Sequence, residues 1–124
     1  MKILVDTCIW SLALRRNHNR PDPAVDELQE LVNEYRVQMI GPIRQEILSG
    51  IKSDAQFEKL REVLRAFPDL HLTSDDYECA ARLFNLCRRK GIQGSNTDFL
   101  ICAVAVRHGL PVFTKDNDFK LYQN

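Results

Sequence analysis

The sequence lacks closely spaced cysteines, a long apolar run and an excess of charge of either sign. Its four cysteines, Cys8, Cys79, Cys87 and Cys102, stand apart in apolar segments, whereas a zinc or thiol redox site needs pairs a few residues apart. We expect them to be small buried side chains in a reducing compartment. The apolar N-terminal stretch is interrupted by Asp6, which argues against a signal peptide or a membrane span. These absences predict a cytoplasmic protein without a membrane segment.

The charge balance and the lack of nucleotide-binding motifs narrow the function further. The 124 residues carry 17 basic and 17 acidic side chains, so a nucleic-acid partner would have to be bound by local patches rather than by overall charge. Neither a glycine-rich dinucleotide fingerprint nor a phosphate-binding P-loop is present. No internal repeat, linker or low-complexity segment divides the chain, and its length suits one domain with its own core. We therefore expect residues 1–124 to form a single domain.

Short apolar runs alternate with helical patterns along the whole chain. The runs that are typical of strands are residues 3–5, 37–40, 70–73 and 111–114. Apolar residues at helical spacing predict helices at about residues 7–14, 23–35, 43–51, 54–67, 75–90 and 96–108. Ser74 is the expected N-cap of the fifth helix. The alternation favours an α/β fold, in which a parallel sheet is covered by helices on both faces and joined by right-handed crossovers.

Four acidic residues are expected at one edge of this sheet. Asp6 directly follows the first strand, Glu46 lies one helical turn after the second, Asp98 opens an apolar helix, and Asp116 follows the last strand. The carboxyl ends of parallel strands meet at the edge where open α/β sheets place their ligands. Ordinary roles are open to each acid: an N-cap for Asp6, a solvated helix face for Glu46, a capping box with Ser95 for Asp98, and turn chemistry for Asp116. Four coincidences at one edge favour a functional cluster.

Clustered carboxylates need a counter-charge. Two of them about 4 Å apart repel by on the order of 4 kcal/mol at an effective dielectric near 20. No buried basic partner stands at an obvious spacing, although Arg44 is close to Glu46 in the sequence and Lys115 directly precedes Asp116. Oxygen ligands without histidine or thiolate favour Mg²⁺ or Mn²⁺ over zinc. Such a site suits phosphodiester hydrolysis, because the metal polarises the phosphoryl group, generates hydroxide and stabilises the leaving oxygen.

Four segments together resemble the PIN domain family, and within it the VapC-type ribonuclease toxins of toxin–antitoxin pairs. The segments are ILVDTCIW (3–10), GPIRQEILSG (41–50), NTDFLI (96–101) and TKDNDF (114–119). The resemblance implies a three-layer α/β/α sandwich on a parallel sheet of four to five strands. It also implies a Mg²⁺- or Mn²⁺-dependent endoribonuclease that forms homodimers and is blocked by a cognate antitoxin.

The resemblance assigns roles residue by residue. It implies that the metal-binding, catalytic acids are Asp6, Glu46, Asp98 and Asp116. Thr114 and Asp118 would be polar neighbours that support these ligands. The family commonly adds an edge strand after the Asp-Phe element, whereas this sequence ends at Asn124, so the fifth strand stays open.

A basic segment follows the first predicted helix. Its residues Arg15, Arg16, His18 and Arg20 could hold RNA phosphates or form an ordinary solvated loop.

Other protein classes fit the sequence less well. A haloacid-dehalogenase-like phosphatase would need a second acid where Cys8 stands. A receiver domain would need an acidic pair after the first strand and a phospho-acceptor aspartate after a central one. The open alternative is a PIN-like module that binds RNA or protein without cutting.

Overall fold

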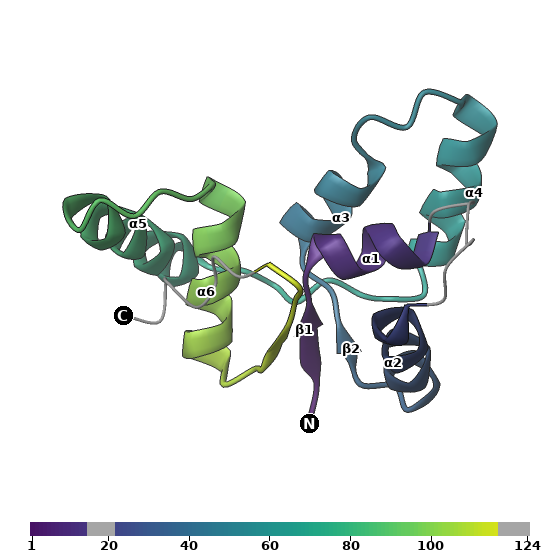
Figure 1. Ribbon diagram of the computed structural model, residues 1–124, viewed down its shortest axis with the longest axis horizontal. Helices are drawn as coiled ribbons and strands as arrows, with labels where there is room; N and C mark the ends of the chain where they lie inside the picture. Colours follow the sequence, from purple (N-terminus) through teal and green to yellow (C-terminus); the bar gives the residue numbers. More distant parts are fainter. Residues whose placement is uncertain (15–21, 117–124) are drawn as a thin grey trace.

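Three parallel strands form the sheet of this protein. The computed structural model describes residues 1–14 and 22–116. In that part of the chain the sheet has the order β2-β1-β3 and consists of β1 (Ile3–Val5), β2 (Val37–Gln38) and β3 (Val112–Phe113). Leu4 pairs with Gln38 on one side and with Val112 on the other, so β1 is the central strand (Figure 1). The residue that follows β1 therefore lies in the middle of the carboxyl edge.

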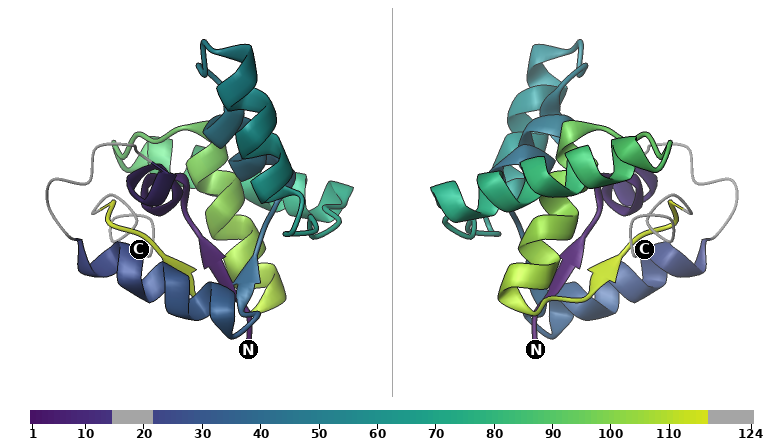
Figure 2. Two further views of the ribbon diagram at one scale, coloured as in Figure 1. Left: turned by 90° about the vertical axis from the view of Figure 1, so that its right-hand side faces the viewer. Right: turned by 90° about the vertical axis from the view of Figure 1, so that its left-hand side faces the viewer.

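Helices cover both faces of the sheet. They are α1 (Thr7–Leu14), α2 (Pro23–Asn33), α3 (Gly41–Leu48), α4 (Asp54–Leu64), α5 (Ser74–Arg89) and α6 (Asn96–His108). The two panels of Figure 2 view the sheet from opposite faces: α1 and α2 lie in front in one panel, and α5 and α6 in the other. This arrangement confirms the predicted α/β/α sandwich. No helix within the described ranges is long and apolar enough to cross a membrane.

The core lies where β1 meets α6. Leu4 and Val5 have no exposed surface, and neither have Ile101, Ala103 and Val104. Helix α6 is apolar nearly all round, and such a helix is stable only when it is buried. It ends at Gly109, which adopts a left-handed conformation (φ 65°) that costs glycine little. Burial in the core thus fixes the helix whose first turn carries Asp98.

The predicted strand at residues 70–73 is wrong. Asp69 forms one isolated parallel bridge with Met39, and the N–H of Leu70 donates to the carbonyl of Met39 at 2.9 Å. The chain then turns into α5, whose N-cap is Thr73 and not Ser74. Too few residues separate Pro68 from this cap for a fourth strand to extend. A fifth strand after residue 116 would lie outside the described residues.

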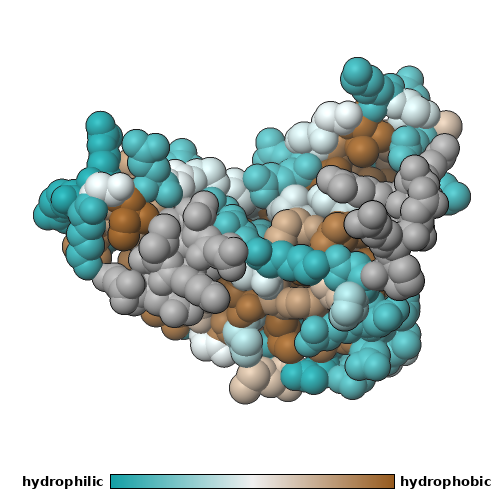
Figure 3. Space-filling model, viewed as in Figure 1, coloured by the Kyte–Doolittle hydropathy of each residue, from teal (hydrophilic) through white to brown (hydrophobic). Residues whose placement is uncertain are grey.

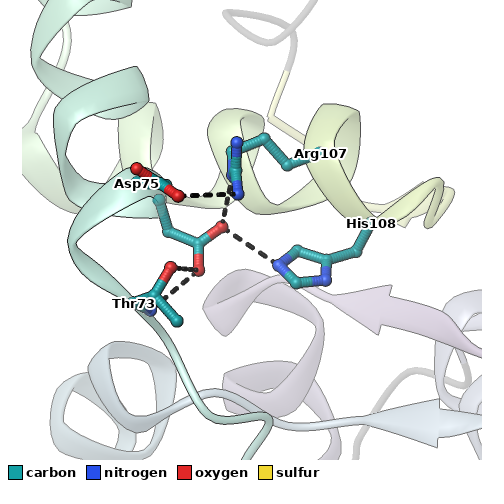
Figure 4. A network of polar contacts seen from close by, with 5 residues as sticks. Thr73, Asp75, Arg107 and His108 are labelled. Carbon is teal, nitrogen blue, oxygen red and sulfur yellow. Dashed lines mark hydrogen bonds and ion pairs between the residues drawn. The ribbon is translucent and has the colours of Figure 1, made fainter.

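A buried carboxylate fastens α5 to α6. The side chain of Asp76 is 1% exposed, and its Oδ1 accepts hydrogen bonds from Arg107 Nε (2.9 Å) and His108 Nε2 (3.0 Å) (Figure 4). Its Oδ2 accepts from the backbone N–H of Thr73 at 2.9 Å. The Thr73 N–H, followed by Arg107 and His108, outweighs burial and lowers the pKa of Asp76 to about 2. The first turn of α5 is thus tied to the last turn of α6.

Candidate active site

Asp6 is buried at the centre of the sheet's carboxyl edge. Its side chain accepts two short hydrogen bonds: Oδ1 from the N–H of Thr7 and Oδ2 from the hydroxyl of Thr114, both at 2.8 Å. The N–H of Asp116 in turn donates to the Thr114 hydroxyl at 2.9 Å. Thr114 therefore links the acid after β1 to the acid after β3. The thiol of Cys8 also donates to Oδ2 of Asp6, at 3.4 Å.

Glu46 reaches this edge from α3. Its side chain is exposed, and its Oε1 accepts a hydrogen bond of 2.7 Å from the hydroxyl of Thr7. Thr7 therefore contacts two acids, Asp6 through its backbone and Glu46 through its side chain. The sequence patterns assign no role to Thr7. The available signal was a hydroxyl side chain directly after an acid at the end of a strand.

Asp98 forms the capping box considered for it. In the first turn of α6 it forms a capping box, in which Asp98 N–H donates to Ser95 Oγ at 3.1 Å and Ser95 N–H donates to Asp98 Oδ2 at 3.4 Å. The pKa of Asp98 is nevertheless raised, first by burial and then by the charges of Asp6 and Asp116. Asp98 is thus close enough to Asp6 and Asp116 to be repelled by both.

The basic residues next to these acids in sequence are paired elsewhere. Arg44, on α3, donates to the carbonyls of Leu64 and Phe67 and forms a 3.0 Å ion pair with Asp69. Lys115 forms an ion pair with Asp22, the N-cap of α2. Neither cation is available to offset the charge of the acids.

The donor chemistry of this edge suits a hard cation, although the ligands are not assembled around a single point. Over residues 1–14 and 22–116, no three His, Cys, Asp or Glu side chains are placed so that they could hold one metal ion. The side chains that would have to converge offer carboxylate oxygens, which Mg²⁺ and Mn²⁺ prefer. Repulsion between them opposes closer approach until a cation is present. The residues thus fit a divalent metal by chemistry.

All four cysteines are free thiols. Burial, followed by the charge of Asp98, raises the pKa of the Cys102 thiol to about 12. A thiol with that pKa stays protonated at neutral pH and is therefore a poor nucleophile.

Two pockets lie beside the first turns of α3 and α6, and one of them is lined by Glu46. One, of about 430 Å³, lies beside Glu46 and is lined by Thr7, Pro42, Gln45, Glu46, Ser49 and Thr97. The other, of about 440 Å³, lies against α5, shares Pro42 and Thr97 with the first, and is lined largely by apolar side chains such as Tyr77 and Phe84. Figure 3 shows the surface hollowed between the side formed by α5 and α6 and the side formed by α3 and α4.

Some predicted site residues lie outside the described residues. They are the basic residues Arg15, Arg16, His18 and Arg20, and Asp118. Their roles remain predictions from the sequence.

Comparisons with known proteins add a family and a fold. The sequence matches the PIN domain family over residues 3–124. It is 34% identical over 121 residues to the VapC ribonuclease Mb1587 of Mycobacterium bovis and to ribonuclease VapC11 of Mycobacterium tuberculosis, which covers 94% of this chain and 88% of each relative.

Solved structures share the fold at lower sequence identity. FitAcB from Neisseria gonorrhoeae matches with a TM-score of 0.77 and 23% identity, over 98% of this chain and 93% of that one. VapBC2 from Rickettsia felis, bound to a DNA fragment from their promoter, matches with 0.77 and 20%, over 98% and 92%. A toxin–antitoxin complex from Klebsiella pneumoniae matches with 0.66 and 22%, over 95% and 90%.

Proposed function

The chain belongs to the PIN domain family, as its motifs indicate, and from this premise we propose that it is a Mg²⁺- or Mn²⁺-dependent endoribonuclease, the toxin of a toxin–antitoxin pair. One observation carries the proposal. The pKa of Asp98 is raised, first by its burial and then by the charges of Asp6 and Asp116, while Arg44 and Lys115 are paired elsewhere. Acids that repel one another in this way favour a divalent cation. The relatives named as ribonucleases support the reaction class.

In this proposal the acids bind the metal, and neighbouring polar side chains orient the acids. We assign the ligand role to Asp6, Glu46, Asp98 and Asp116. When bound, the metal would polarise the phosphoryl oxygens and supply hydroxide. Thr114 donates to Asp6 and thereby fixes the orientation of that carboxylate, and Asp118 is a further supporting acid by motif.

The described side chains have complementary tasks in this reaction. Asp6 is held by three donors, so it needs little reorganisation when a cation binds. The capping box similarly restrains Asp98. Since the described acids repel phosphate, we propose that the sequence-predicted cations Arg15, Arg16 and Arg20 contact the RNA backbone.

A direct assay tests the proposed function. Purified protein should cleave single-stranded or looped RNA in Mg²⁺ or Mn²⁺ and lose this activity in chelator. Asp98→Asn should be inactive, whereas Asp54→Asn, which changes an exposed acid at the start of α4, should cleave like the wild type. Cleavage that continues unchanged in chelator would exclude the metal mechanism.

A non-catalytic module that binds RNA or protein is the second candidate. It is favoured by the lack of three convergent metal ligands among the described residues. It predicts RNA or partner binding with no cleavage in either metal. Binding and cleavage measured on the same RNA therefore separate the two functions.

We also propose a cognate antitoxin, a homodimer and a cytoplasmic location. The structural neighbours that are toxin–antitoxin complexes support the antitoxin. An arginine of the antitoxin is the suitable probe of an acidic cluster, because its guanidinium pairs with carboxylates. Antitoxin binding should then weaken in Asp6→Asn and Asp98→Asn, and equal binding would exclude this mode. The mass in solution tests the homodimer.

A further inference from the structure

The pocket beside Glu46 is lined mainly by uncharged polar side chains. Thr7, Pro42 and Thr97 come from the first turns of α1, α3 and α6, and Gln45 and Ser49 lie on the exposed face of α3. The Thr7 hydroxyl that lines it is hydrogen-bonded to Glu46. The pocket therefore opens directly beside a proposed metal ligand.

This lining suits an uncharged group that forms hydrogen bonds. No Lys or Arg is among its lining residues, and its single charged group, Glu46, would repel a phosphate. The side-chain amide of Gln45 offers a donor and an acceptor side by side. The structure shows no hydrogen bond from this amide to another described residue. Amide side chains pair with the hydrogen-bonding edges of bases, and single-stranded RNA is recognised at those edges.

The adjoining pocket offers a second type of surface. It continues from the shared residues Pro42 and Thr97 to the aromatic side chains of Tyr77 and Phe84. Bases stack on apolar and aromatic side chains whatever their sequence. A polar pocket that leads into an apolar one matches a nucleotide, whose base has polar edges and an apolar face.

We propose that the pocket lined by Gln45, Ser49 and Thr97 binds the base of a nucleotide next to the scissile phosphate, and that Gln45 reads its edge. This inference rests on the proposed ribonuclease function. Gln45 is a determinant of base preference in it, and the acids remain the catalytic groups. The RNA is then selected at α3, one residue from the acid Glu46.

Binding of short RNAs tests the proposal. Fluorescein-labelled eight-nucleotide homopolymers of U, C, A and G are titrated in the Asp98→Asn background with Mg²⁺, so that no cleavage competes. The background protein should bind one base at least fivefold more tightly than the weakest. Adding Gln45→Ala should bring the four affinities within about twofold. Gln29→Ala, which removes an exposed glutamine on α2, should leave the preference intact.

The salt dependence of binding distinguishes a base from a phosphate in this pocket. Loss of a base contact should leave the slope of affinity against salt unchanged, whereas loss of a phosphate contact reduces it. Equal weakening for all four homopolymers with a smaller slope would show a phosphate site and overturn the inference. A preference that survives Gln45→Ala, or no RNA binding at all, would also overturn it.

The proposed function is scored separately, by cleavage with the wild type. A Gln45-dependent preference in a protein that never cleaves would support the pocket and refute the nuclease. Cleavage whose base preference is independent of Gln45 would support the nuclease and refute the pocket. Thermal unfolding checks that Gln45→Ala is folded, as expected for an exposed position.

Discussion

Two capping boxes in this protein place an aspartate at the same local position and give it opposite surroundings. Asp76 and Asp98 are each the third residue of a helix, and each accepts from the backbone N–H of its N-cap. Asp76 also meets Arg107 and His108, and its pKa falls to about 2. Asp98 meets burial and other acids, and its pKa rises. The local motif sets where the acid stands, and its tertiary surroundings set the direction in which its pKa shifts.

The largest expected difference between the two aspartates is in catalysis. Asp98→Asn should reduce RNA cleavage by at least 100-fold, or about 2.7 kcal/mol in activation free energy, because it removes a proposed metal ligand. Asp76→Asn should retain activity within about threefold per folded molecule. Initial rates in Mn²⁺, normalised by the folded fraction, measure both. Equal losses of activity in the two variants would show that Asp98 in the capping box of α6 has only a structural role, like Asp76 in that of α5.

Metal should stabilise the protein through one aspartate and not the other. Mn²⁺ that binds only the folded state should raise the free energy of unfolding by about 2.7 kcal/mol at a hundredfold excess over its Kd. Asp98→Asn should gain less, and in chelator it should be at least as stable as the wild type, because one like charge is gone. A purely structural cap predicts a loss of up to about 1 kcal/mol with or without Mn²⁺. Thermal melts with chelator and with Mn²⁺ decide between these outcomes.

Acid should remove the stabilisation that Asp76 provides. Its folded pKa of about 2 lies below its ordinary value of 3.8, so the contribution is complete above pH 5 and is lost as the pH falls toward 2. The shift corresponds to about 2 kcal/mol. Asp76→Asn should therefore be less stable at pH 7 by a similar amount and should lack this component of the acid dependence. Urea unfolding at several pH values measures it, and identical pH profiles would contradict the role of this carboxylate.

The smallest predicted effect compares two threonines. Thr7→Val removes the hydroxyl that donates to Glu46 and should weaken Mn²⁺ binding about five- to tenfold, which corresponds to about 1 kcal/mol, the net value of a typical hydrogen bond. Thr7→Ser should restore it. Thr73→Val removes a hydroxyl 3.4 Å from Asp76 and should leave the Mn²⁺ affinity unchanged. Titration of the thermal shift with Mn²⁺ gives both values, and no change in Thr7→Val would refute its positioning role.

The layers of the fold and the order of the acids could be predicted from the sequence, because buried strands and helix caps leave local patterns. The strand at residues 70–73 could not, since a short alternating run does not show that Thr73 already caps a helix. The ion-pair partners of Arg44, Asp76 and Lys115 lie at least 25 positions away in the chain. Such pairings are decided by tertiary packing, which no local pattern records.

The central position of β1 has a consequence for protein synthesis. This strand is made before its neighbour β3, and Thr114 contacts Asp6 across 108 residues. Contacts of such long range form late, after the costly closure of a loop. At about 5 to 20 residues per second, a ribosome releases β3 several seconds after β1. The acidic edge therefore cannot assemble on a chain that lacks β3, and the proposed metal site stays incomplete until that strand has been translated.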